Sequence, residues 1–332
     1  MTRAAAKLID RRTVLGGLVA AASAPRAWAA PEALTYLFPA PVSLPAFMPF
    51  HIAKQRDYFG KNNIAVEFRT GRGGADVAQQ VAVGNASLGG GVGETPIIVR
   101  ANGLPVRCVA QLGRRSLFQL VVRKDVGVKS IADLRGRKLG VIGYQDTGYY
   151  ALLAVIATAG LKRADLEIQA VGASGVTQLM LTKSLDGIMA VPEWADTIET
   201  GGVALDYFEI DTKFPAMAQA ILASDKIVKE RPAAVASFVK AVLQAVRDCI
   251  ADPTQATRDF VAAVPQWAGK EADMERILRR YVASVYTGGD AGQPLGGFDP
   301  ARITTVQEFY IKNQIVRTAV PVEQLYTNEF VP

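Results

Sequence analysis

The sequence predicts an α/β protein built from two units, each a mostly parallel sheet flanked by helices. From residue 33 onward, short apolar runs alternate with helical stretches of about ten residues, which is the pattern of βαβ units. The alternation restarts near residue 120, and the chain becomes strongly helical after residue 215. With 332 residues, half of them hydrophobic and a fifth charged, the chain is long enough for about two domains.

The elements of the first unit are separated by loops rich in proline or glycine. A strand at 34–38 leads into the rigid loop 39–45 and a helix at 46–56. Glycines within 71–74 separate a strand at 64–69 from the next helix, which runs to residue 83. The remaining elements are expected as a strand at 86–91, a helix at 95–101 and strands at 106–112 and 117–123.

The second unit and the C-terminal helices follow the same reasoning. In the second unit we expect helices at 131–134, 149–159 and 175–182 and strands at 138–142, 166–171 and 185–191. Apolar residues then recur at helical spacing over 235–250. Pro232 suits the first turn of that helix, and Asp252-Pro253 ends it. Two further helices are expected at 273–285 and 304–313.

Residues 1–29 are predicted to be an export signal. Arg11 and Arg12 precede an apolar run at 14–24, and residues 27–29 form a small-x-small cleavage site. The run is shorter than the roughly 20 residues that span a bilayer. The paired arginines and the weak hydrophobicity favour twin-arginine export, with the general route and an amphipathic helix of a cytoplasmic protein as alternatives. We therefore expect a periplasmic protein that is soluble after signal cleavage.

The charge and the cysteines exclude several classes of protein. The signal holds five basic groups and one acid, so the net charge of +6 falls to +2 without it, and nothing indicates a nucleic-acid partner. Cys108 and Cys249 lie in apolar stretches, which favours two buried thiols over a disulfide. His51, the one histidine, is expected to pack among apolar neighbours, and a triad or a His-ligated metal site is hard to build with it alone.

Seven short motifs occur in a fixed order between residues 49 and 235. They are PFHIAKQRDYF at 49–59, GGADV at 73–77, VGNASLGGG at 83–91, ANGLPV at 101–106, IADLRGRKLG at 131–140, LDGIMA at 185–190 and ERPAAV at 230–235. In this combination the chain resembles the periplasmic solute-binding proteins of ABC importers, in the branch for sulfonates, taurine, nitrate and thiamine-pyrimidine precursors.

The resemblance implies the two-lobed, type II periplasmic binding-protein fold, with the ligand cleft between the lobes. Lobe 1 would comprise residues 30–118 and 216–332, and lobe 2 residues 119–215. The lobes would close by a hinge around a small organic solute, and the closed form would dock on a membrane permease. We expect a monomer with no catalytic residue, no metal and no cofactor.

Candidate ligand-binding residues follow the carboxyl ends of the predicted strands, where open α/β sheets bind ligands. After the first strand, Phe38 can stack on a flat ligand and Ser43 can hydrogen-bond to it, although the loop suits a purely structural turn equally well. After the second strand, Gly73 and Gly74 let backbone N–H groups approach a ligand, or form a plain flexible loop.

The loop before the helix at 149–159 is the strongest candidate site. It contains Tyr144, Asp146, Thr147 and Gly148 and precedes a helix N-terminus, where anions are favoured. Thr147 matches the small hydroxyl residues that the resemblance places in this loop of sulfonate binders. Asp146 would disfavour a sulfonate and favour an amine or aminopyrimidine, unless it serves only as the helix cap.

Two further pairs of residues complete the candidate site. Glu94 and Thr95 follow the third strand, where Thr95 is either a ligand contact or a helix N-cap. Glu193 and Trp194 follow the strand at 185–191, so Glu193 can accept from an amino group and Trp194 can stack. A core role for the tryptophan is the alternative.

Three functions stay open from the sequence. An importer receptor is favoured, and a receptor for a sensor system is the first alternative. The second is an enzyme like the fungal pyrimidine-precursor synthases, which share the fold and consume one of their own histidines. The resemblance places that histidine near Phe47 rather than at His51, and the cysteine-rich motif of those synthases is absent. For the ligand, charge favours an amine-bearing heterocycle, with a sulfonate as the alternative.

Overall fold

Two five-stranded sheets organise the protein. The computed structural model describes residues 1–2, 30–208, 214–287 and 294–332, so the signal predicted at 1–29 lies almost wholly outside the described residues. The first sheet holds β1 (Glu32–Phe38), β2 (Ile64–Thr70), β3 (Leu88–Val92), β4 (Val106–Gln111) and β10 (Gln219–Ser224). The second holds β5 (Gln119–Arg123), β6 (Lys138–Val141), β7 (Glu167–Ala170), β8 (Gly187–Ala190) and β9 (Leu205–Phe208).

The two sheets have the same pattern of strand directions. Their orders are β2-β1-β3-β10-β4 and β7-β6-β8-β5-β9. In each sheet the fourth strand of the order, β10 or β5, is antiparallel to both of its neighbours, and the other pairs are parallel. The predicted α/β fold with mostly parallel sheets is therefore confirmed. The sequence did not indicate β9 or β10.

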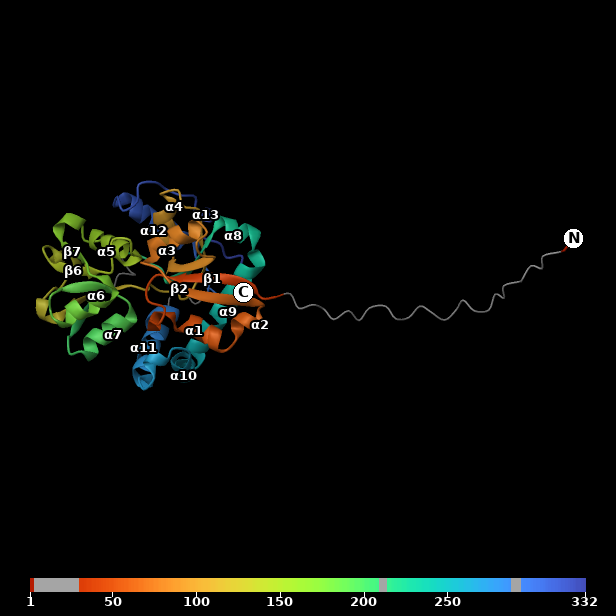
Figure 1. Cartoon of the computed structure of the whole chain (residues 1–332). Helices are drawn as coiled ribbons and strands as arrows, with labels where there is room; N and C mark the ends of the chain where they lie inside the picture. Colours follow the sequence, from red (N-terminus) through yellow and green to blue (C-terminus); the bar gives the residue numbers. More distant parts are fainter. Residues whose placement is uncertain (3–29, 209–213, 288–293) are drawn as a thin grey trace. The chain divides into compact units, whose positions relative to one another are not determined.

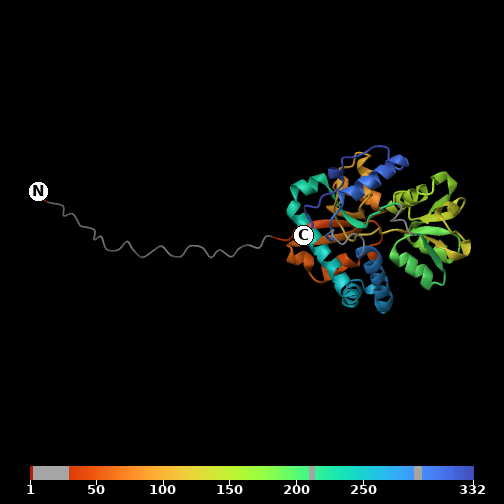
Figure 2. The same ribbon diagram turned by 180° about the vertical axis from the view of Figure 1, so that it is seen from behind.

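Helices cover both sheets. They are α1 (Met48–Gln55), α2 (Tyr58–Lys61), α3 (Gly74–Ala82), α4 (Thr95–Arg100), α5 (Thr147–Ala157), α6 (Gly172–Leu181), α7 (Pro192–Thr200), α8 (Asp225–Glu230), α9 (Pro232–Ala251), α10 (Pro253–Ala263), α11 (Glu271–Tyr281), α12 (Pro300–Lys312) and α13 (Val322–Leu325). In Figures 1 and 2, seen from opposite sides, α5 to α7 group with β6 and β7, apart from α1, α9 and α10.

Short helical turns occur at several connections. They are η1 (Pro45–Phe47), η2 (Lys124–Val126), η3 (Ile131–Leu134), η4 (Arg163–Asp165), η5 (Pro265–Trp267) and a π-helical turn, η6 (Val282–Tyr286). None of the helices in the described ranges combines the length and apolar character that crossing a bilayer requires.

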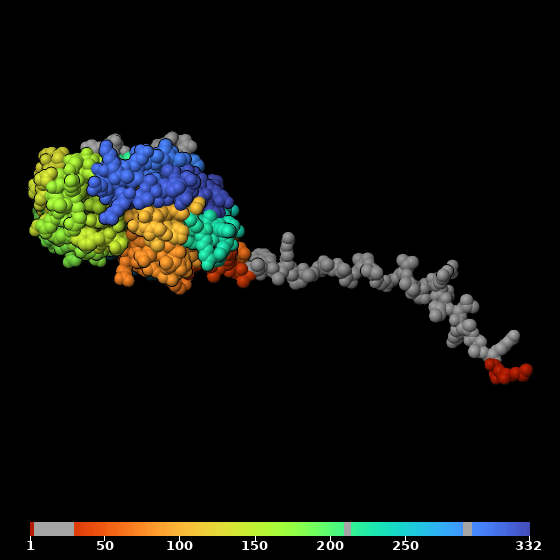
Figure 3. All heavy atoms as spheres, turned by 90° about the horizontal axis from the view of Figure 1, so that it is seen from above, coloured from red at the N-terminus to blue at the C-terminus, as the bar shows by residue number. Residues whose placement is uncertain are grey.

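The core is densely aromatic around β1. Tyr36 is fully buried, and its ring centroid lies 4.7 Å from that of Phe50 and 5.1 Å from that of Phe238 on α9. At the C-terminus, shown in blue in Figure 3, α13 packs on α4 and β4. Cys108 and Cys249 are both buried free thiols, which confirms the interpretation favoured from the sequence.

Two segments connect the sheets, between β4 and β5 and between β9 and β10. They pair with each other where the N–H of Leu117 donates to the carbonyl of Met217 at 3.2 Å, and the N–H of Leu112 donates to the carbonyl of Gln219, the first residue of β10, at 2.7 Å. The lobe boundaries predicted after residues 118 and 215 fall in or next to these segments. The division into lobes itself stays a prediction.

Candidate functional site

A narrow pocket lies between the two sheets, where the carboxyl ends of β1, β3, β6 and β8 meet. It encloses about 480 Å³ of space between atoms, part of it open to solvent, while the volume open to the centre of a water molecule is about 50 Å³. The lining residues are Pro39, Ala40, Leu44, Ala46, Phe47, Gly91, Val92, Leu117, Phe118, Ile142, Asp146, Thr147, Val191, Glu193, Trp194 and Gln219.

Four of the predicted site residues line this pocket together. They are Asp146 and Thr147 at the start of α5 and Glu193 and Trp194 at the start of α7. Both helices begin directly after a parallel strand of the second sheet, so their first turns face the pocket. Their role in binding a ligand stays a prediction.

Glu193 is a buried carboxylate with one oxygen unused. The hydroxyl of Tyr281 donates to Oε2, whereas Oε1 has no hydrogen-bond partner among the described residues. Burial raises the pKa of Glu193 to about 7, although the Tyr281 bond and backbone N–H groups, including that of Ala46, act to lower it. Near neutral pH this side chain can therefore accept a hydrogen bond or, when protonated, donate one.

Asp146 is the N-cap of α5 and is also buried. Its Oδ2 accepts from the backbone N–H of Gly148 at 2.9 Å. Burial raises the pKa of Asp146 to about 6, against the lowering effect of backbone N–H groups of Gly148, Thr147 and Gly74. The capping role that the sequence offered is confirmed. The carboxylate also faces the backbone N–H of Gly74, although neither Gly73 nor Gly74 lines the pocket.

Gly73 and Gly74 bring the two sides of the pocket into backbone contact. A Cβ at Gly73, whose φ is +104°, would lie 2.9 Å from both the Cα of Asp146 and the carbonyl oxygen of Gln145. A Cβ at Gly74 would lie 2.7 Å from Cγ2 of Thr147. The N–H of the next residue, Ala75, donates to the Gln145 carbonyl at 3.3 Å. The lack of a side chain at Gly73 and Gly74 thus permits this close approach to the loop that contains Gln145, Asp146 and Thr147.

Several predicted residues lie away from the pocket. Phe38 is fully buried against Phe47 and Phe50, with ring centroids 4.4 and 5.1 Å away, and so packs in the core of the first sheet. Ser43 uses its carbonyl oxygen to accept from Nε1 of Trp267 at 2.8 Å. Neither residue contributes to the pocket lining, so ligand stacking by Phe38 would require its ring to leave the core.

The remaining residues on the β3 side are engaged in local structure. Glu94, not Thr95, occupies the N-cap position of α4, so a capping role for Thr95 is wrong. Oγ1 of Thr95 instead accepts from the N–H of Val92 at 2.9 Å, because the chain turns sharply after β3. Oε1 of Glu94 accepts from the N–H of Met217 at 2.5 Å.

In the α5 loop, two predicted residues also lie outside the lining. The hydroxyl of Tyr144 donates to the carbonyl of Ile168 at 3.1 Å, and the residue as a whole is 44 % exposed. Gly148 is buried beneath Asp146 and serves the cap through its N–H. The sequence placed the whole loop at the site, whereas only its centre, Asp146 and Thr147, reaches the pocket.

Three important lining residues were missed from the sequence. Phe47 falls in a run predicted as an ordinary helix, and Phe118 lies in the first connection between the sheets. Gln219 begins the strand β10, which the apolar run did not reveal. It is 2 % exposed, and its Oε1 has no hydrogen-bond partner among the described residues. Unpaired buried acceptors of this kind are rare and call for an explanation.

His51 packs as the sequence predicted. It is 8 % exposed, its Nε2 lies 2.8 Å from the carbonyl of Val42, and its ring contacts Phe68 and Phe260. Burial lowers its pKa. In the described ranges we find no group of three or more potential ligands that could hold a metal ion.

The topology of the two sheets defines the class of protein: the chain has the type II periplasmic binding-protein fold. A solved structure with this fold is the alkanesulfonate-binding protein SsuA from Xanthomonas axonopodis pv. citri bound to MOPS. It superposes with a TM-score of 0.70 at 18 % identity, over 90 % of this chain and 99 % of that one. The predicted fold and the resemblance to solute-binding proteins are confirmed.

The chain belongs to the NMT1/THI5-like family, whose sequence profile matches residues 44–256. It is 26 % identical over 290 residues to the riboflavin-binding protein RibY of Chloroflexus aurantiacus, over 86 % of this chain and 82 % of that protein. It is 21 % identical over 309 residues to the 4-amino-5-hydroxymethyl-2-methylpyrimidine phosphate synthase THI11 of Saccharomyces cerevisiae, over 86 % of this chain and 84 % of the synthase. The relatives of this chain thus include both a binding protein and a synthase.

Proposed function

We propose that this protein is the substrate-binding component of an ABC importer and captures a small, flat heterocycle that carries N–H donors, such as an aminopyrimidine. The observation that carries the proposal is the polar lining of the pocket. Asp146, Glu193 and Gln219 supply acceptor oxygens, and the lining residues in the described part of the chain include no lysine or arginine. Such a lining selects for donors on the ligand.

The two unpaired acceptors define what the ligand must offer. Oε1 of Glu193 and Oε1 of Gln219 are buried without a partner in the described residues, and an unsatisfied buried acceptor costs about 1–3 kcal/mol. An exocyclic amino group or a ring N–H would satisfy them. Because Glu193 has a pKa of about 7, its protonated form can also donate to a ring nitrogen.

A sulfonate fits the same pocket less well. Helix N-termini attract anions, and α5 and α7 both begin at the pocket. Each of these helices already has a carboxylate in its first turn or at its cap, however, namely Glu193 and Asp146. A sulfonate would therefore meet negative charge once these groups ionise.

The aromatic lining supports a planar ligand. Phe47, Phe118 and Trp194 all line the narrow pocket, and an aromatic ligand ring can pack against them in offset-stacked or edge-to-face geometry. The named relatives support the same class, since riboflavin and the pyrimidine phosphate are nitrogen heterocycles.

Binding without chemical conversion is proposed over the synthase alternative. The resemblance places the reactive histidine of the synthases near Phe47, and Phe47 is the residue that lines the pocket here. His51 packs behind it, with Nε2 2.8 Å from the Val42 carbonyl. A receptor would release its ligand chemically unchanged, which mass spectrometry of the recovered ligand tests.

A periplasmic location and a permease partner complete the proposal. Both rest on the predicted signal at 1–29 and on the similarity to periplasmic binding proteins of importers. Replacing Arg11 and Arg12 with lysine should retain the protein in the cytoplasm, whereas unchanged export would favour the general route. A permease gene beside the coding sequence would favour the importer over a sensor. We expect the receptor to act as a monomer.

The ligand class is tested by calorimetry and thermal melting of the full chain. The probes are 4-amino-5-hydroxymethyl-2-methylpyrimidine, riboflavin and taurine. A ligand at 100 times its Kd stabilises the folded state by about 2.7 kcal/mol, so binding of a heterocycle should raise the melting temperature by a measurable amount. We expect the pyrimidine to do so and taurine not to. Stabilisation by taurine alone would reject the proposal.

Two pocket variants and one matched control test individual residues. Glu193→Gln should weaken pyrimidine binding tenfold or more. Glu167→Gln serves as the matched control because Glu167 lies on β7 with half of its side chain exposed and outside the pocket lining. Asp146→Asn should also weaken binding, and an unchanged affinity would leave Asp146 with its capping role alone.

A further inference from the structure

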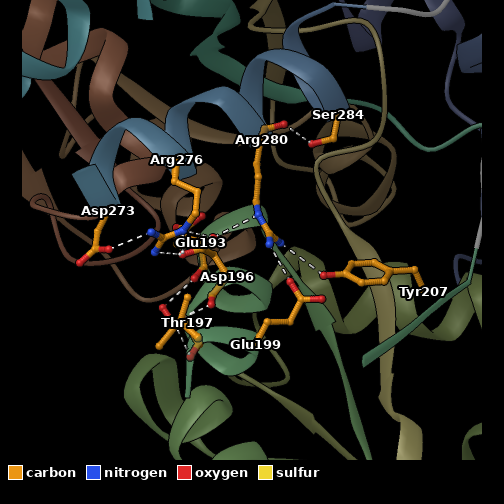
Figure 4. Close-up of polar contacts among 10 residues, drawn as sticks. Glu193, Asp196, Thr197, Glu199, Tyr207, Asp273, Arg276, Arg280 and Ser284 are labelled. Atoms are coloured by element: carbon orange, nitrogen blue, oxygen red, sulfur yellow. Dashed lines mark hydrogen bonds and ion pairs between the residues drawn. The ribbon is translucent and has the colours of Figure 1, made fainter. Parts of the chain in front are cut away.

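The contact between α7 and α11 connects the helices of the second sheet with those of the first. α7 follows β8, whereas α11 packs on α10 and η1, which in turn pack on α1. At the centre of this contact lies Asp196 of α7, whose side chain is only 2 % exposed (Figure 4). A carboxylate buried so completely must be paired to be tolerated.

Two arginines of α11 pair with this carboxylate. Nε and Nη2 of Arg276 donate to Asp196 at 2.9 Å each, and Nε of Arg280 lies 3.1 Å from it. Arg280 also donates to Glu199 at 2.7 Å and to the hydroxyl of Tyr207 at 3.4 Å. We refer to Asp196, Glu199, Arg276 and Arg280 as the α7–α11 ion-pair cluster. Arg276 also pairs with Asp273 of α11 at 2.9 Å.

The burial of the cluster is asymmetric. The side chains of Arg276 and Arg280 are 41 % and 35 % exposed, whereas Asp196 is sheltered beneath them. Moving α7 away from α11 would therefore strip the carboxylate of both arginines. It would have to be hydrated at once, because an uncompensated buried charge is strongly unfavourable.

The same two helices, α7 and α11, also position Glu193, whose carboxylate lines the pocket. Glu193 lies three residues before Asp196 on α7, so both side chains project from one face of the helix. Tyr281 follows Arg280 on α11 and donates its hydroxyl to Glu193. A single alignment of α7 against α11 thus determines both contacts.

We propose that Asp196 is a positioning residue for ligand capture: by pairing with Arg276 and Arg280 it holds α7 against α11 and fixes Glu193 at the pocket. The ligand-binding part of this inference rests on the proposed function. Every member of the cluster belongs to the chain itself, so the pairing needs no group of the ligand. Asp196 therefore acts through Glu193 and does not touch the ligand.

The position of the helices is measured directly by spin-label distances on the full chain. Nitroxides on Gln178→Cys in α6 and Ala262→Cys in α10 report the separation, because both sites are exposed and both native cysteines are buried. Asp196→Asn should broaden the distance distribution and shift it to longer values. In the same variant, the affinity for 4-amino-5-hydroxymethyl-2-methylpyrimidine should fall at least tenfold.

A matched control lies on the same helix. Arg279 pairs with Glu275 within α11, so Arg279→Gln should leave both the distances and the affinity as in the wild type. If Asp196→Asn fails to fold, the double variant Arg276→Gln/Arg280→Gln tests the same contact from its exposed side.

The outcomes separate this inference from the proposed function. The inference would be overturned if Asp196→Asn gave the same distance distribution as the wild type, whether both distributions are narrow or both are broad. If the pyrimidine does not bind even to the wild type, the proposed ligand fails, and the distances still decide whether the cluster holds the helices. Longer distances with an unchanged affinity would overturn the link to Glu193.

Discussion

Gly74→Ala should separate the stability of this protein from its capacity to bind ligand. Gly74 is the first residue of α3, and its φ lies outside the left-handed region, so alanine can adopt its backbone conformation. Alanine is also the better helix former, by up to about 1 kcal/mol. Within α3 taken alone, the free energy of unfolding should therefore be unchanged or higher, so any loss of stability measures the contact with Thr147.

The new methyl group would interfere with the contact across the pocket. Its carbon would lie 2.7 Å from Cγ2 and 3.1 Å from Oγ1 of Thr147, well inside van der Waals distance. Thr147 is 5 % exposed and β-branched, so its side chain has little freedom to turn aside. Overpacking of this kind costs about 1–3 kcal/mol. If ligand binding needs the two sides in contact, affinity should fall about 5- to 150-fold, at about 1.4 kcal/mol per factor of ten.

Calorimetric titration with 4-amino-5-hydroxymethyl-2-methylpyrimidine measures the affinity, and urea unfolding measures the stability. Gly143→Ala is the control, because a Cβ at Gly143 would meet no atom within 4 Å. Thr147→Ser removes the crowded methyl group. Adding Gly74→Ala to Thr147→Ser should therefore lower the affinity much less than adding it to the wild type. Wild-type affinity in Gly74→Ala would refute the reasoning.

Three further perturbations test other features. Buried Glu193 has a pKa of about 7 in the folded state against 4.5 ordinarily, so the folded state keeps this proton to higher pH than the unfolded state does. The free energy of unfolding measured with urea should therefore fall between about pH 4.5 and 7. Glu193→Gln should remove up to ~3 kcal/mol of that decline, and an unchanged pH profile would contradict the assignment. Arg302 donates to the carbonyls of Pro215, Ala216 and Arg114 in the segments between the sheets, so Arg302→Met should lower the free energy of unfolding by about 2–3 kcal/mol; a loss below about 0.5 kcal/mol would show that these bonds contribute little. His51→Phe should leave pyrimidine affinity within about twofold while costing about 1 kcal/mol of stability, whereas lost binding would implicate the histidine directly.

The order of the strands and helices was largely predictable because it depends on local pattern. Alternating apolar runs and helical stretches revealed β1 to β8, and Pro232 and Asp252 marked the ends of α9 correctly to within a residue. The strand β10 was missed because all six of its residues are buried. A strand buried on both faces shows no alternation of apolar and polar residues.

The candidate site was predictable only as a set of loops. Asp146 and Glu193 were found because they follow parallel strands, where ligands bind in α/β folds. Phe38 is the last residue of such a strand, β1, yet it packs in the aromatic core with Tyr36. Which side of a strand end faces the pocket depends on the packing of helices that are distant in the sequence.

The sequence by itself determined the α/β class. It also determined that the glycines before α3 and the carboxylates at the starts of α5 and α7 lie in loops after strands, since each of these features depends on neighbours within a few residues. Only the tertiary structure decided that Gly74 meets Thr147, that Gln219 returns to the pocket on β10, and that α11 supplies Tyr281 to Glu193. These contacts join segments roughly 70 to 130 residues apart, so they follow from the path of the chain between the two sheets. No local pattern encodes that path.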